Sequence, residues 1–186
     1  MAPKSLRRIF GRIAVLALLL PISWFASAQT SDSATINELL ANAKSHAYLA
    51  TDDAGTLESY TRSQLSWKSH ALRLQTIKEH VNNLIKDVNE LNSKRADGSP
   101  WQQEAIDRIN PLLKEMADQL NTTIEHLNAN PNRIQMQAYR DYVHANREVI
   151  NRTHNMISDF LDYAEAKSKA DSLEKALELP SETEGE

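Results

Sequence analysis

The chain has 186 residues, of which 21 are Lys or Arg and 25 are Asp or Glu, so its formal net charge is −4 at pH 7. It has no cysteine, which excludes disulfide bonds, thiolate metal sites and covalent c-type haem attachment. An acidic chain is poorly suited to bind nucleic acid or anionic lipid, and a chain of this length can bury one hydrophobic core.

Residues 1–28 have the three parts of a secretory signal peptide. Four basic residues precede an apolar run at 13–20, and Ala-Ser-Ala at 26–28 matches a cleavage site. The apolar run is too short for a permanent membrane anchor. Arg7-Arg8 also resembles the twin-arginine export motif. We therefore expect an exported protein, periplasmic or secreted, and removal of the four basic residues takes the formal charge from −4 to −8.

A short polar leader at 29–33 precedes the first expected helix, at 34–50. The inward side of this helix changes from Ile36, Leu39 and Leu40 to alanines, which lets another helix approach closely. Thr51-Asp52-Asp53 is expected to be a tight connection, because these residues commonly cap helices.

The second expected helix runs from 56 to 91 and carries the longest apolar periodicity in the chain. Its apolar residues alternate steps of three and four, which is the pattern of a helix that packs along another helix. The stripe consists of Leu74, Ile77, Val81, Leu84, Val88 and Leu91.

The third expected helix begins with a strong start signal and ends near 127. Ser99 is expected at the N-cap, Pro100 at the first helical position, and Gln102 in a capping box. Pro111 lies inside the helix and lacks a backbone donor, so it predicts a kink, with a break and restart as the alternative.

The fourth expected helix runs from 131 to about 177, and an acidic tail predicted to be disordered follows at 179–186. Asn146 and Thr153 interrupt its apolar stripe at inward positions. Since the connections are short, consecutive helices should be antiparallel neighbours. The sequence therefore predicts an all-α fold over 34–178, an up-down-up-down four-helix bundle with long helices 2 and 4.

Two of the six histidines are candidate metal or haem ligands. His70 lies on the inward stripe of the second helix, and an antiparallel hairpin places it level with His126 on the third. Two imidazoles on facing helices can bind haem axially, or Zn or Cu with an added carboxylate such as Glu125. The alternative is that both are structural. His80, His144 and His154 are expected at the polar faces.

The bundle plan is similar to that of the exported four-helix cytochromes, although Cys-x-x-Cys-His is missing and the fold alone does not define a function. Six aromatic residues could line a ligand pocket at an end of the bundle or fill its core. They are Trp67, Trp101, Tyr139, Tyr142, Phe160 and Tyr163.

No nucleophile elbow, phosphate-binding glycine loop or paired-carboxylate cleft is evident. The leading hypothesis is therefore an exported, non-enzymatic bundle without a cofactor, acting as a binding or structural scaffold for an unidentified protein or small ligand. The alternatives are a haem- or metal-binding bundle centred on His70 and His126, and a periplasmic chaperone-like protein. An apolar edge on the first helix, or the extended end of the fourth, could close a homodimer.

Overall fold

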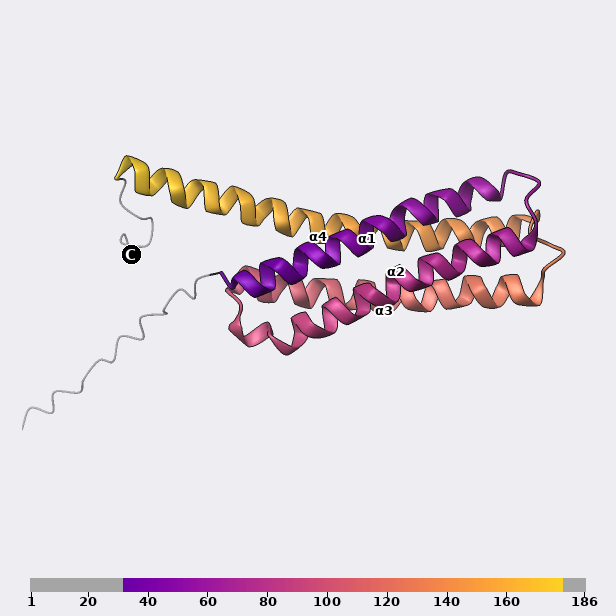
Figure 1. The fold of residues 1–186 in the computed structure, drawn as a ribbon, viewed down its shortest axis with the longest axis horizontal. Helices are drawn as coiled ribbons and strands as arrows, with labels where there is room; N and C mark the ends of the chain where they lie inside the picture. Colours follow the sequence, from indigo (N-terminus) through magenta and orange to yellow (C-terminus); the bar gives the residue numbers. More distant parts are fainter. Residues whose placement is uncertain (1–31, 179–186) are drawn as a thin grey trace, which may run out of the picture.

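A computed structural model describes residues 32–178, and the predicted all-α four-helix bundle is confirmed there (Figure 1). The predicted signal peptide, the first three leader residues and the predicted tail at 179–186 lie outside the described residues. The elements are α1 (Ala34–Tyr60), α2 (Trp67–Ser93), the short 3-10 helix η1 (Arg95–Asp97), α3 (Pro100–Ala129) and α4 (Gln137–Leu177).

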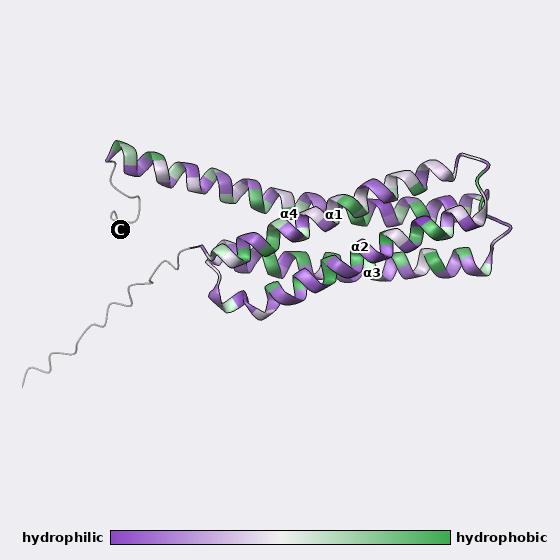
Figure 2. Ribbon diagram, in the orientation of Figure 1, coloured by the Kyte–Doolittle hydropathy of each residue, from purple (hydrophilic) through white to green (hydrophobic). Residues whose placement is uncertain are grey.

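The helices pack in an up-down-up-down arrangement, in which each packs against its neighbour in the chain and α1 closes the ring against α4. The apolar residues of each helix are concentrated on its inward side (Figure 2). The inward side of α1 changes from Ile and Leu to alanines along 36–50, as expected, and Ala43, Ala47 and Ala50 are fully buried. Small side chains there allow the neighbouring helices to approach closely.

The predicted boundary between the first two helices was wrong. Residues 51–53 continue α1, which runs to Tyr60, and α2 begins at Trp67, so both helices have 27 residues. The apolar stripe of α1 continues through Ala54 and Leu57, and burial of this stripe outweighs the weak helix preference of Thr, Asp and Gly. The real turn follows Tyr60, whose carbonyl accepts a hydrogen bond from the hydroxyl of Ser63.

Gln102 joins the N-terminal ends of α1 and α3. Its side-chain oxygen accepts hydrogen bonds from the backbone N–H groups of Ser99 and Ser33, each at 2.9 Å. Its side-chain nitrogen donates to the Ser33 carbonyl at 2.9 Å and to the side-chain oxygen of Asn37 at 2.8 Å. The predicted start of α3 is therefore confirmed. The helix continues through Pro111, so the alternative of a break there was wrong, while the kink stays a prediction.

The fourth helix begins at Gln137, six residues later than predicted, because 131–136 form turns. With 41 residues, α4 is longer than its neighbours and extends beyond the end of the bundle (Figure 1). Among residues 32–178, no helix combines the length and apolar character needed to cross a membrane. The last part of α4 therefore has no neighbouring helix of the bundle beside it.

Candidate functional site

A cleft of about 280 Å³ lies between the first turns of α3 and the middle of α4. Side chains three or four residues apart on a helix share one face, so three residues of α3 and four of α4 meet across this cleft. The lining residues are Trp101, Glu104, Arg108, Met156, Asp159, Phe160 and Tyr163.

The aromatic rings of the cleft are held by neighbouring groups. The indole N–H of Trp101 donates to the carboxylate of Asp32 at 2.8 Å, and its ring meets Tyr163 edge-on, with centroids 5.8 Å apart. The guanidinium of Arg108 lies over the ring of Phe160, 5.6 Å from its centroid. This attraction arises because the face of an aromatic ring carries a negative partial charge.

The charged side chains of the cleft are solvated. Arg108 and Glu104 approach to 4.0 Å, and both side chains are more than half exposed. Asp159 is also exposed. Exposed pairs of this kind contribute little to stability, so these groups are free to rearrange around a ligand.

Four of the six aromatic residues take one of the two expected roles, whereas the exposed Trp67 and the half-buried Tyr142 lie outside both the cleft and the buried core. Trp101, Phe160 and Tyr163 line the cleft, whereas Tyr139 is 1% exposed in the core. Tyr163 is 51% exposed because it lies beside Trp101 in the first turn of α3, where the bundle ends, whereas Phe160 is half-buried.

Arg108, Glu104, Asp159 and Met156 were missed as site residues. The available signal was helical spacing, since Glu104 and Arg108 repeat the face of Trp101, and Met156 repeats that of Phe160. This signal alone does not show that the two faces meet.

The structure brings His70 and His126 to the same aromatic side chain. His70 is fully buried, as its inward position predicted, and its Nδ1 shares a hydrogen bond with the Tyr139 hydroxyl at 3.1 Å. The half-buried His126 stacks on Tyr139, with centroids 6.2 Å apart, and lies 4.5 Å from the ring of Tyr142. No cluster of three or more potential metal ligands occurs within residues 32–178. A metal or haem held by the pair stays a prediction.

Burial lowers the pKa of His70 below its usual value. The unfolded chain then binds a proton more readily than the folded protein, so stability falls as the pH drops below the unfolded pKa of about 6.5. We expect the free energy of unfolding to fall by about 1 kcal/mol more between pH 7.5 and 5.5 in the parent than in His70→Gln. Urea unfolding at both pH values measures this difference, and equal losses would contradict it.

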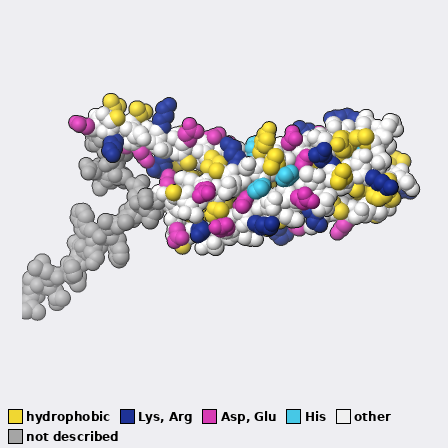
Figure 3. All heavy atoms as spheres, in the orientation of Figure 1, with side chains coloured by type: hydrophobic (Ala, Val, Ile, Leu, Met, Phe, Trp, Pro, Cys, Tyr) yellow, Lys and Arg dark blue, Asp and Glu magenta, His cyan; other side chains and the backbone are white. Residues whose placement is uncertain are grey.

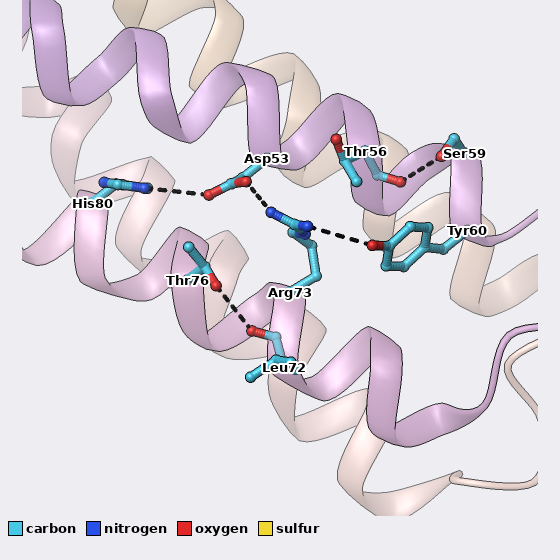
Figure 4. A network of polar contacts seen from close by, with 8 residues as sticks. All are labelled: Asp53, Thr56, Ser59, Tyr60, Leu72, Arg73, Thr76 and His80. Atoms are coloured by element: carbon cyan, nitrogen blue, oxygen red, sulfur yellow. Dashed lines mark hydrogen bonds and ion pairs between the residues drawn. The ribbon is translucent and has the colours of Figure 1, made fainter.

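A second polar cluster joins α1 to α2 (Figure 4). The buried carboxylate of Asp53 accepts a hydrogen bond from Arg73 and lies 3.3 Å from Nε2 of His80. Arg73 also donates to the hydroxyl of Tyr60 at 3.4 Å, and these two contacts raise the pKa of its guanidinium.

This cluster resembles the acid–base part of a catalytic site, but its nearby hydroxyls are otherwise engaged. Ser59 donates to the Thr56 carbonyl and Thr76 to the Leu72 carbonyl. A second pair lies seven residues away on each helix, because His46 precedes Asp53 on α1 and Asp87 follows His80 on α2. The side chains of His46 and Asp87 approach to 3.7 Å. The repeat at heptad spacing indicates polar pairing between two antiparallel helices. Histidine side chains lie between acidic ones near the middle of the face in Figure 3.

Of the histidines expected at polar faces, His144 is exposed and contacts Glu58 at 3.0 Å. His80 and His154 are half-buried.

Comparisons with protein-family models, with curated proteins and with solved structures found no match to the chain.

Proposed function

We propose that the chain is an exported, non-enzymatic binding protein. In this proposal the bundle is a rigid scaffold, and the cleft between α3 and α4 holds an apolar or aromatic part of the ligand or partner. Export is supported by the three-part pattern of residues 1–28. A binding role without catalysis is supported by a lining of aromatic rings, Met156 and solvated charges, with no Ser, Thr, Cys, His or Lys among the described residues that line the cleft.

The exposure of the aromatic cleft is the observation that carries the proposal. The bundle buries Tyr139 completely, yet leaves Tyr163 half exposed beside the half-buried Trp101 and Phe160. Water contact with neighbouring aromatic rings is unfavourable. Trp, Tyr and Arg are also the residues that dominate binding energy at interfaces, so this cleft has the composition of a binding site.

The extension of α4 prolongs the same surface. Leu173 and Leu177 are 52% and 65% exposed, and they continue from Tyr163 at steps of three and four through Ala166 and Ala170. Residues at this spacing lie on one side of a helix. A partner that occupies the cleft would therefore meet further apolar side chains along α4.

Site-directed photo-crosslinking in the native host tests the proposal. A benzophenone amino acid replaces Tyr163 at the rim of the cleft in one chain and Leu72 of α2 in a control chain. Leu72 is 71% exposed, so the control is at least as accessible. We expect one discrete adduct from position 163, its loss when Phe160→Ala is added, and no such adduct from position 72.

Equal labelling from both positions, or none from position 163, would contradict the proposal. An adduct with twice the mass of the chain would assign the surface to self-association, and would replace a separate partner by a homodimer. Circular dichroism of each chain shows whether the substitution has left the helical fold intact.

A further inference from the structure

Three aromatic residues, Trp101, Phe160 and Tyr163, line one small space. Trp101 and Tyr163 are in edge contact, and Phe160 lines the same cleft from α4. Cations are attracted to aromatic faces, most strongly to Trp and then to Tyr and Phe. A cleft with one ring of each kind is suited to a positively charged group.

Arg108 shows that one of these rings already attracts a cation. Its guanidinium lies over Phe160, while its side chain is 54% exposed and its nearest carboxylate, Glu104, is 4.0 Å away. A guanidinium held by these weak contacts can move into solvent at little cost. The chain's own cation therefore marks a position that an external cation can take.

The remaining charges of the cleft also favour a cation. Glu104 and Asp159 are acidic, and Arg108 is the single basic residue among those that line the cleft. The nearby Lys167 is engaged by Asp171 at 3.0 Å. An anionic ligand would approach two carboxylates, whereas a cation would gain from both.

The size and apolar lining of the cleft narrow the class of cation. A volume of about 280 Å³ is below the usual range of drug-sized pockets, so it suits one head group. Met156 and the aromatic carbon atoms cannot replace the water of a small, strongly hydrated ion, and the carboxylates of Glu104 and Asp159 belong to exposed side chains that are hydrated themselves. An alkylated ammonium presents methyl groups to the apolar part of the lining and can keep its charge near these two carboxylates.

We infer that the cleft binds a soluble organic cation of the quaternary ammonium class, with Trp101, Phe160 and Tyr163 around the cation and Glu104 and Asp159 at its edge. This inference rests on the proposed binding function, because it names the ligand of the same cleft.

A pair of probes that differ only in charge tests the inference. Choline and its neutral carbon isostere, 3,3-dimethylbutan-1-ol, are titrated into the mature chain and followed by the indole N–H resonances in NMR spectra. Trp101 reports on the cleft, and Trp67, which begins α2 at the opposite end of the bundle, is the internal control. We expect choline to shift the Trp101 resonance with a Kd about threefold or more below that of the isostere.

If the ligand is a cation, some substitutions within the cleft should weaken choline binding and one should strengthen it. Phe160→Leu keeps an apolar side chain without a ring face, so it should weaken choline binding about threefold and leave the isostere unchanged. Arg108→Gln should tighten choline binding, because it removes the competing guanidinium and frees Glu104. Asp159→Asn should weaken it, whereas Asp162→Asn, an exposed neighbour outside the cleft lining, should not.

Equal or tighter binding of the isostere, equal shifts of Trp67 and Trp101, or weaker choline binding in Arg108→Gln would overturn the inference. Vesicles of phosphatidylcholine form a second arm, and binding to these vesicles without binding to free choline would overturn the assignment of a soluble ligand. If the crosslink from position 163 appears while choline fails, the binding function stands and only the ligand class is wrong. If both fail, the proposed function fails as well.

Discussion

Asp53→Asn is expected to lower the free energy of unfolding by about 2 kcal/mol at pH 7, because it leaves Arg73 and His80 without their shared carboxylate. Asp53 is buried, so its charge is compensated by these side chains rather than by water. The larger cost of breaking a fully buried pair is reduced here because the Arg73 side chain is partly exposed.

Asp52→Asn is the matched control for this substitution. Asp52 is the neighbouring residue of the same helix and is exposed, so its replacement should change stability by less than about 0.5 kcal/mol. Urea unfolding followed by circular dichroism measures both variants. Similar losses for the two would show that general charge, rather than the contact between α1 and α2, is responsible.

Asn146→Leu is expected to raise the free energy of unfolding by about 2 kcal/mol, because a buried polar group without hydrogen bonds is costly. Asn146 is fully buried on α4, and neither its side-chain oxygen nor its side-chain nitrogen has a partner in the structure. Leucine has the same number and branching of side-chain heavy atoms as asparagine, and it replaces the unpaired amide with apolar contact. The same urea experiment measures the gain.

Thr153→Val provides the comparison, about two helical turns further along α4. Thr153 is equally buried, but its hydroxyl donates to the Val149 carbonyl at 2.9 Å, so its replacement should be close to neutral. Loss of stability in Asn146→Leu would show that the amide is hydrogen-bonded in solution. Light scattering of the leucine variant tests whether the buried amide also specifies the association state, as asparagine does in some coiled coils.

Sequence alone predicted much of the bundle because apolar spacing records which side of a helix is buried. The stripe of α2 from Leu74 to Leu91 is buried as predicted. Inward Asn146, Thr153 and His70 were placed correctly, since their positions follow from the same period. The start of α3 was predictable because Pro100 and Gln102 act within a single helical turn.

The end of α1 depended on contacts between helices. Thr51, Asp52 and Asp53 suggested a connection, because these residues commonly cap helices. The partners that keep Asp53 in α1 come from α2, twenty or more residues away. A local pattern cannot contain that information, so the boundary was misplaced.

The cleft depended on the relative lengths and positions of the helices. Helical spacing fixes the sides of α3 and α4 on which Trp101, Phe160 and Tyr163 lie. Packing between the helices brings these sides together and leaves α4 extending beyond its neighbours. The physical reason is that periodicity fixes a direction around one helix axis, whereas exposure depends on which other helices reach the same height.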